Sequence, residues 1–299
     1  MQRSPFSNLD SETVGLVYGF LGVLCFSLTL PATRAAVADL DPVVVGLGRS
    51  MVAAMLAAIL LGVTHQKRPS RQQIKSLIIV ALGVVIGFPI LSAWAMLNLP
   101  ASHGAIVLAI GPLVTAIAGT LRTGDRPSLS FWLASVLGSA TVVSFAVYSG
   151  AGHIQIGDLA LLGAMIAASF GYAEGALLAQ VMGGWQVISW GLIVAAPMML
   201  LPVMFAVWQH GLVASPTAWL GFSYIAVFSQ FLAFFAWYKG LAIGGVARVG
   251  QVQLLQPFLT IAASSLLLGE AISPLVIGTA IVVFIIVILG KKAAVKRAI

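Results

Sequence analysis

The chain contains the segment "GPLVTAIAGTLRTGDRPS" at 111–128 and a second version of it, "QPFLTIAASSLLLGEAIS", at 256–273. The two segments are 145 residues apart and share six identical positions, and Asp125 stands opposite Glu270. The identical positions are Pro112/Pro257, Thr115/Thr260, Ala118/Ala263, Leu121/Leu266, Gly124/Gly269 and Ser128/Ser273. This is more agreement than chance provides between two apolar windows, so the sequence predicts an internal duplication.

The composition is that of a membrane protein. Of the 299 residues 60% are hydrophobic and only 8% are charged, whereas about 25% of the residues of a soluble domain are charged. The formal net charge is +7. The basic residues stand at the ends of apolar segments, where they set membrane topology, so this charge does not predict nucleic-acid binding.

Ten segments are long and apolar enough to cross a bilayer, which takes about 20 residues as a helix. They are 13–33, 43–63, 76–97, 101–121, 130–149, 157–179, 186–208, 217–238, 243–268 and 273–290. Tight turns are expected at 98–100 and 238–245, where apolar sequence is almost continuous. An open sheet would leave backbone groups unpaired in lipid, so we expect an all-α protein.

The basic residues predict the orientation of these spans. In a ten-span arrangement, Arg34 falls on one side, Arg49 lies inside the second span, and the other thirteen fall on the opposite side. Those thirteen are Arg3, Lys67, Arg68, Arg71, Lys75, Arg122, Arg126, Lys239, Arg248, Lys291, Lys292, Lys296 and Arg297. Since cytoplasmic loops are enriched in Lys and Arg, we expect a multi-pass protein of the cell inner membrane with both termini in the cytoplasm.

The duplication divides the chain into two units of five spans, 1–150 and 151–299. Five is an odd number, so the second unit must enter the membrane in the opposite direction to the first. Such inverted repeats are typical of secondary transporters, whose substrate site lies near the midplane between the repeats. The pattern predicts alternating access, in which the two copies exchange conformations.

Three stretches resemble the EamA-type transporters of the drug/metabolite transporter superfamily. They are "DPVVVGLGRSMVAAMLAAILL" (41–61), "GDLALLGAMIAASFGYAE" (157–174) and "WYKGLAIGGVARVGQVQLLQPFLTIAASSLLLGEAISPLVIGTAIVVFIIVIL" (237–289). Within this superfamily the chain is most similar to bacterial exporters of aromatic and other amino acids. The resemblance implies ten helices in two inverted repeats that export a small organic solute. We expect a monomer in the lipid bilayer, with no cofactor, no metal site and no catalytic residues.

Charged residues within the spans are the first candidates for a substrate site, because charge in a bilayer is costly. Arg49 lies about 12 Å into its span and either binds a substrate carboxylate or pairs with helix carbonyls or Glu174. Glu174 is a candidate proton carrier or partner for a substrate ammonium group. The alternatives are a structural ion pair and a side chain that reaches out to the cytoplasmic interface. His103 and Arg248 occupy corresponding positions in the two units, either as polar groups at opposite gates or as interfacial residues.

Aromatic and amide side chains complete the predicted site. The aromatic candidates for cavity lining are Trp94, Tyr172, Trp237 and Tyr238. The alternative is an interfacial belt, where Trp and Tyr are enriched. The amide candidates are Gln230, Gln251, Gln253 and Gln256, because buried amides require partners that a wet cavity supplies. Pro112 and Pro257 are candidate hinges or static kinks, since each removes a backbone donor within a span.

Other functions compete with amino-acid export. Export of a different small solute or drug, with or without proton coupling, remains open. A channel would need a continuous polar stripe, which these apolar spans lack. An intramembrane enzyme would need a histidine at the depth of Ser223 in "GFSYIA" (221–226), and the four histidines fall at or near span ends.

Overall fold

The computed structural model describes residues 11–123, 126–149, 154–291 and 295–296, nearly all of them helical. The helices of the first half are α1 (Ser11–Ser27), α2 (Thr29–Val37), η1 (Val44–Gly48), α3 (Arg49–Val63), α4 (Arg71–Val80), η2 (Ala81–Gly87), α5 (Phe88–Ala95), α6 (Ala101–Val107), η3 (Leu108–Ile110), α7 (Gly111–Thr123) and α8 (Leu129–Ser149). Those of the second half are α9 (Ile156–Met182), α10 (Gly184–His210), α11 (Pro216–Tyr224), η4 (Ile225–Leu232), α12 (Ala233–Gly244), α13 (Val246–Gly250), η5 (Gln251–Leu255), α14 (Gln256–Leu268) and α15 (Pro274–Lys291). Segments η1, η2 and η4 are π-helical, and η3 and η5 are 3₁₀-helical. Two short strands, β1 (Arg126–Pro127) and β2 (Val295–Lys296), pair antiparallel.

Eight continuous helical segments are long and apolar enough to span a membrane. They are Ser11–Val37, Val44–Val63, Arg71–Ala95, Ala101–Arg122, Ile156–Met182, Gly184–His210, Pro216–Gly244 and Val246–Leu268. They correspond to the predicted spans one to four and six to nine. The predicted fifth and tenth spans correspond to α8 and α15. Their apolar stretches, Val136–Phe145 and Pro274–Ile286, are shorter than a membrane-spanning helix requires. An all-helical membrane protein is confirmed, and the count of ten crossings stays a prediction.

One predicted turn was placed wrongly. The turn expected over 238–245 is helical as far as Gly244, and the chain reverses at Gly245, where φ is +86°. Glycine adopts this left-handed region without the steric cost that other residues incur. The glycines that suggested an early break are instead used in packing, because they let α12 approach its neighbour closely.

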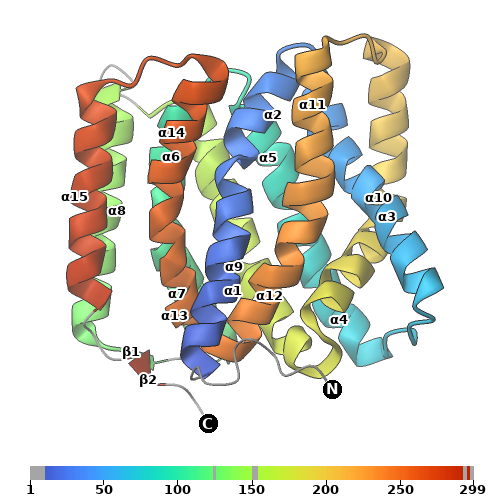
Figure 1. Cartoon of the computed structure of the whole chain (residues 1–299), viewed down its shortest axis with the longest axis horizontal. Coiled ribbons are helices and arrows are strands. Elements are labelled where there is room, and N and C mark those ends of the chain that lie inside the picture. Colours follow the sequence, from blue (N-terminus) through green and yellow to red (C-terminus); the bar gives the residue numbers. More distant parts are fainter. Residues whose placement is uncertain (1–10, 124–125, 150–153, 292–294, 297–299) are drawn as a thin grey trace.

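The helices form one bundle, and each of its two lateral edges is made by a pair of helices (Figure 1). Helices α8 and α15 lie side by side at one edge, and α3 packs against α10 at the other. In the interior, α1 packs along α12, and α9 packs along α4 and α5. Helix α1 begins and α15 ends on the lower side in Figure 1. The central helices therefore come from both halves of the chain.

Small residues allow the two interior pairs to pack backbone against backbone. A Cβ atom placed on Gly15 would lie 2.5 Å from the Cα of Gly244, and one on Gly240 would lie 2.7 Å from the backbone nitrogen of Gly19. On the other pair, a Cβ on Gly83 would collide with the carbonyl oxygen of Ala167. Close approach at glycine is a common way for membrane helices to associate.

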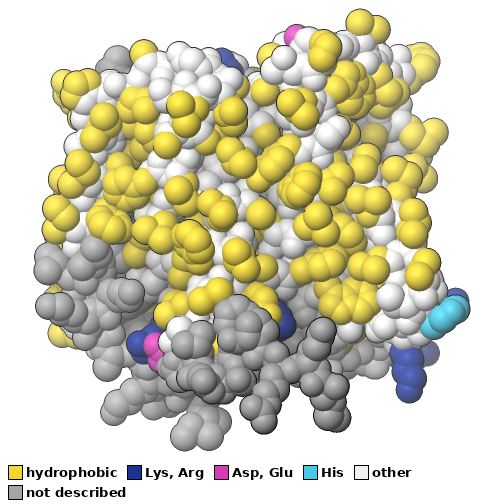
Figure 2. Space-filling model, viewed as in Figure 1, with side chains coloured by type: hydrophobic (Ala, Val, Ile, Leu, Met, Phe, Trp, Pro, Cys, Tyr) yellow, Lys and Arg dark blue, Asp and Glu magenta, His cyan; other side chains and the backbone are white. Residues whose placement is uncertain are grey.

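The surface matches a lipid environment. Figure 2 shows hydrophobic side chains across the middle of one face, with the charged side chains near its lower and upper edges. Large apolar side chains such as Leu121, Leu201 and Leu266 are more than half exposed. In water such a surface would drive association, whereas in a bilayer it is the surface that contacts lipid.

Candidate functional site

A narrow cavity lies in the centre of the bundle, between helices of the two halves. Its lining side chains are Phe26, Thr29, Arg49, Val84, Phe88, Leu108, Met165, Ala168, Tyr172, Ser229, Gln230, Phe234, Gln253 and Gln256. The first six come from α1 through η3, and the other eight come from α9 through α14. The cavity volume is about 30 Å³, which accommodates about two water molecules and nothing as large as an amino acid.

Arg49 is the charged residue of this cavity. It opens α3 directly after the π-helical segment η1, and its side chain is 1% exposed. One guanidinium nitrogen, Nη2, lies 3.4 Å from Oγ of Ser92. Its Nε and Nη1 have no hydrogen-bond partner within the described part of the chain. Burying donors without acceptors is costly, so Arg49 is the first candidate among the lining residues for binding a ligand.

The predicted pairing of Arg49 with Glu174 is not formed. Glu174, which is 3% exposed, instead accepts hydrogen bonds from Nε and Nη2 of Arg122, the former at 2.7 Å. Arg122 ends α7, whereas Arg49 begins α3. Glu174 is therefore half of an ion pair between α7 and α9, and it is not among the residues that line the cavity.

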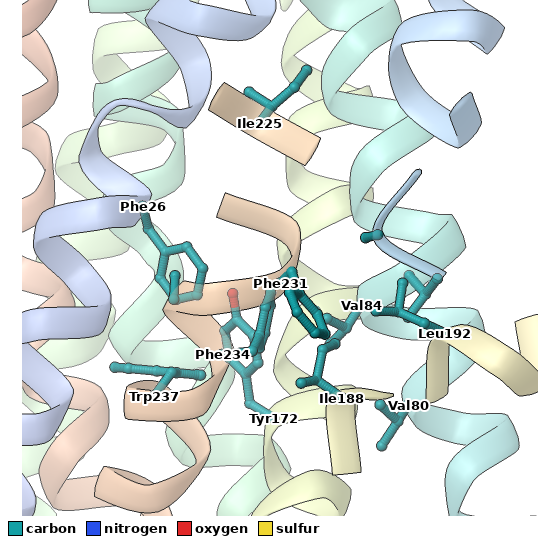
Figure 3. Close-up of a cluster of buried hydrophobic side chains, with 14 of the residues drawn as sticks. Phe26, Val80, Val84, Tyr172, Ile188, Leu192, Ile225, Phe231, Phe234 and Trp237 are labelled. Atoms are coloured by element: carbon teal, nitrogen blue, oxygen red, sulfur yellow. The ribbon is translucent and has the colours of Figure 1, made fainter. Parts of the chain in front are cut away.

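Aromatic rings form one side of the cavity. Phe26, Tyr172 and Phe234 line it, and Trp237 lies against the first two, with ring centroids 6.0 Å from Phe26 and 5.3 Å from Tyr172. Figure 3 shows these four rings grouped between the helices that carry them. Trp237 is fully buried, and its Nε1 has no partner among the described residues. The next residue, Tyr238, donates its hydroxyl to the carbonyl of Gly171 at 3.2 Å.

Amide and hydroxyl groups form the polar part of the lining. Gln230 donates to the carbonyl of Val84 at 3.3 Å, and Gln253 donates to Oγ1 of Thr115 at 3.3 Å. Gln256 also lines the cavity. Gln251 is buried but is not a lining residue, and its Nε2 has no partner in the described structure. The amides thus join the two halves around the cavity, because both hydrogen bonds link a residue of one half to a residue of the other.

Ion pairs connect the helices below the cavity, on the side where α1 begins. The Arg122–Glu174 pair joins α7 to α9. Arg248 of α13 pairs with Glu12 of α1, and both of these side chains are at least one-third exposed. Together these pairs hold the lower ends of helices from different halves.

A second set of polar contacts connects the helices on the upper side. His103 Nε2 lies 2.7 Å from Oδ1 of Asp158, which joins α6 to α9. Glu270, in the connection from α14 to α15, accepts the backbone N–H groups of Ala101 and Ser102 at 2.8 and 3.0 Å. A carboxylate at this position satisfies the first N–H groups of α6 and interacts favourably with its helix dipole. Polar contacts therefore join helices of the two halves on both sides of the bundle.

The structure places the predicted site residues in three groups. Arg49, Tyr172, Gln230, Gln253 and Gln256 line the cavity. The second group is buried but does not line the cavity, and it consists of Trp237, Tyr238, Gln251, His103 and Glu174. Trp94 is 38% exposed and is not a lining residue, so the structure does not bring it to this site.

Sequence reasoning missed several residues of the site. Phe26 and Phe234 look like ordinary apolar span residues, and no local pattern distinguishes them. Asp158 and Glu270 were not among the predicted site residues. For Glu270 a signal existed, because it lies in the duplicated segment opposite Asp125.

Each of the two candidate hinges comes just after a 3₁₀-helical segment. Pro112 is the second residue of α7 and comes after the 3₁₀ segment η3, and Pro257 is the second residue of α14 and comes after η5. Proline is well tolerated in the first turn of a helix, where its missing N–H has no intrahelical role. The repeated proline therefore marks the point in each copy where a 3₁₀ segment gives way to an α-helix.

The fold and cavity define a multi-pass helical membrane protein of the transporter class. The chain belongs to the EamA-like transporter family, whose model matches it twice, over residues 13–146 and 155–290. It is 41% identical over 290 residues to a Bacillus subtilis protein named "Uncharacterized transporter YdeK", covering 97% of this chain and 99% of that one. It is 23% identical over 284 residues to a "Probable terminal-alkyne amino-acid exporter" of Streptantibioticus cattleyicolor, covering 93% of each. A crystal structure at 16% identity shares the fold, with a TM-score of 0.68 over 92% of this chain and 94% of that one.

Proposed function

We propose that this transporter exports amino acids, preferably hydrophobic or aromatic ones, or related small metabolites across the cell inner membrane by alternating access. The observation that carries the proposal is the central cavity, which is lined by both halves of the chain, with polar contacts between the halves above and below it. A cavity of about 30 Å³ must widen before it holds a solute. The protein acts as a monomer with both termini in the cytoplasm.

Several features support an inverted repeat of the units 1–150 and 151–299. One match of the family model falls in each unit. The third predicted span of each unit contains a π-helical segment, η2 or η4, and the fourth contains a 3₁₀ segment, η3 or η5. The first span of each unit packs along the third span of the other. In Figure 1, α4 begins at the lower side and α11 begins at the upper side, as inversion requires.

In this mechanism the two sets of polar contacts are the gates. Opening toward the cytoplasm separates Arg122 from Glu174 and Arg248 from Glu12. Opening toward the other side separates His103 from Asp158 and releases Glu270 from the start of α6. Both sets of contacts are formed in this structure, as an occluded state of such a carrier would require. A carrier of this kind never opens both gates at once, and this distinguishes it from a channel.

The aromatic rings that line the cavity support a substrate with an apolar or aromatic side chain. Phe26, Tyr172 and Phe234 can pack against an apolar or aromatic side chain, and such ring contacts contribute about 0.5–1.5 kcal/mol beyond the area that they bury. The name of the Streptantibioticus relative agrees with an amino-acid substrate. Export of another small solute, with or without proton coupling, is the alternative.

Transport by the purified protein in liposomes tests the proposal. We expect uptake of labelled phenylalanine, leucine or a related amino acid in a panel of all twenty, and acceleration by unlabelled substrate on the far side, because carriers show such counterflow and channels do not. Transport of none of the twenty would refute the amino-acid assignment. Transport that is unchanged by a pH gradient would refute proton coupling.

Cross-linking tests the gates. A short reducible bis-thiosulfonate reagent should cross-link cysteines placed at Glu12 and Arg248 and lock the cytoplasmic side. The same reagent on cysteines at Ala101 and Glu270 should lock the other side. The native Cys25 is first replaced by alanine in both variants. Either lock should abolish counterflow until it is reduced, because both gates must open in turn. A locked protein that still exchanges substrate would contradict alternating access.

A further inference from the structure

We infer that the solute is recognised through a carboxylate held by Arg49, and that its ammonium group contributes little to binding. This inference rests on the proposed function and narrows its substrate class to carboxylic acids with an apolar or aromatic body. The central cavity combines one buried, unpaired cation with aromatic rings and amides. The hydrogen-bond partners that these groups already have determine which part of a solute they can bind.

The guanidinium of Arg49 has the donors that a carboxylate requires. Its Nε and Nη1 are buried and have no acceptor in the described chain, and Nη2 makes only a 3.4 Å contact with Ser92. The planar guanidinium fits a carboxylate through two parallel hydrogen bonds, and such charge-assisted pairs are about twice as strong as neutral ones. A solute carboxylate would supply acceptors to these donors and neutralise the charge.

No carboxylate of the protein is available for this purpose among the described residues. Each of the six carboxylates that the structure describes has a partner elsewhere. The pairs are Glu12 with Arg248, Asp39 with the N–H of Ser215, Asp41 with the N–H of Val43 and with His210, Asp158 with His103, Glu174 with Arg122, and Glu270 with the N–H groups of Ala101 and Ser102. The positive charge of Arg49 therefore has no counter-ion within the described structure.

Among the described residues, the cavity lining offers an ammonium group no carboxylate. The acceptors of its lining are neutral amides and hydroxyls, such as those of Gln230, Gln256 and Ser229. A primary amine without a carboxylate would place a second positive charge beside Arg49, and like charges in a site of low dielectric repel. The arrangement thus favours an acid over an amine that has the same ring.

Three ligands with the same aromatic ring separate these contributions. L-phenylalanine has both charges, 3-phenylpropionate has only the carboxylate, and 2-phenylethylamine has only the ammonium. Binding to the full-length protein in nanodiscs is measured directly by calorimetry in chloride-free sulfate buffer at pH 7, and in parallel by the rise of the unfolding temperature that a bound ligand produces. The variants are Arg49→Gln, Arg49→Lys and, as the matched control, Arg71→Gln at the exposed start of α4.

We expect the wild type and the Arg71→Gln control to bind phenylalanine and phenylpropionate with affinities within about tenfold of each other, and to bind phenylethylamine at least 30-fold more weakly. A factor of roughly 30 corresponds to about 2 kcal/mol, the lower end for removing one partner of a buried charged pair. Arg49→Gln should lose the preference for the acid. Arg49→Lys, which keeps the charge and serves if the glutamine variant does not fold, should bind the acid more weakly than the wild type, because a lysine cannot form the paired hydrogen bonds.

The outcomes separate this inference from the proposed function. Binding of phenylethylamine as tight as that of phenylpropionate, or acid binding unchanged in both Arg49 variants, overturns the inference. If phenylalanine is transported in liposomes but phenylpropionate does not bind, the inference fails and the proposed function stands. If phenylpropionate binds through Arg49 but no amino acid is transported, the inference stands and the amino-acid assignment fails. Binding of neither acid overturns the inference.

Discussion

Replacing Arg122 and replacing Glu174 should destabilise the protein to different extents, although both changes break the same ion pair. The side chain of Glu174 is 3% exposed, whereas that of Arg122 is 43% exposed. Arg122→Gln therefore leaves a buried carboxylate without its donors, and Glu174→Gln leaves a guanidinium that can turn into water. The cost of the first change arises from the stranded charge and not from the lost attraction alone.

The magnitudes follow from these exposures. Removing one partner of a fully buried pair costs about 3–5 kcal/mol, and the access of water to Arg122 lowers this to about 2 kcal/mol for Arg122→Gln. For Glu174→Gln we expect at most about 1 kcal/mol. At about 2–4 °C per kcal/mol, Arg122→Gln should lower the unfolding temperature by about 4–8 °C. The double variant should resemble Glu174→Gln, because it contains no stranded carboxylate.

The assay is thermal unfolding of the purified variants in one detergent at one scan rate, followed by tryptophan fluorescence. The Arg71→Gln variant again serves as a control for the loss of a positive charge at an exposed position. An unfolding temperature that falls as far or further for Glu174→Gln than for Arg122→Gln would refute the reasoning, since the carboxylate would then not be the buried member that depends on its partner.

Further predictions concern packing and the cavity wall. Gly15→Val should destabilise the protein by at least about 1–3 kcal/mol, because its side chain would meet the backbone of Gly244; Gly62→Val, with no atoms within 4 Å of its Cβ, should change stability by no more than about 0.5 kcal/mol in the same unfolding assay. Equal effects would contradict the close crossing. Phe234→Ala should reduce transport of aromatic amino acids about tenfold, the equivalent of about 1.4 kcal/mol of lost ring contact. Trp94→Phe should leave transport unchanged, because Trp94 lies outside the cavity, and a loss of transport would show that the site extends further.

The helices could be predicted from the sequence because lipid imposes a simple rule. A span needs enough apolar residues to cross and must satisfy its backbone internally, so length and composition locate it within a few residues. The exception over 238–245 shows the limit of this rule. Glycine there suggested a break, but in a membrane glycine also permits close packing, and only the neighbouring helix decides which effect dominates.

The site could be predicted only in part, because helical periodicity does not determine which helix a side chain faces. Arg49 and three of the four glutamines were recognised as unusual in apolar spans, and they do line the cavity. The partner of Glu174 could not be deduced, since Arg122 lies 52 residues away and meets it only through tertiary packing. Phe26 and Phe234 carry no polar signal at all.

The five-residue 3₁₀ segment η5, which contributes Gln253 to the cavity, would change its length and twist if it became α-helical. A 3₁₀-helix rises about 2.0 Å per residue with 3.0 residues per turn, against about 1.5 Å and 3.6 for an α-helix. Rewinding η5 as α-helix would shorten it by about 2.5 Å and rotate one end against the other by about 100°. Gln253 would then point elsewhere and α14 would turn against α13, so a change of winding within one short segment would remodel the cavity.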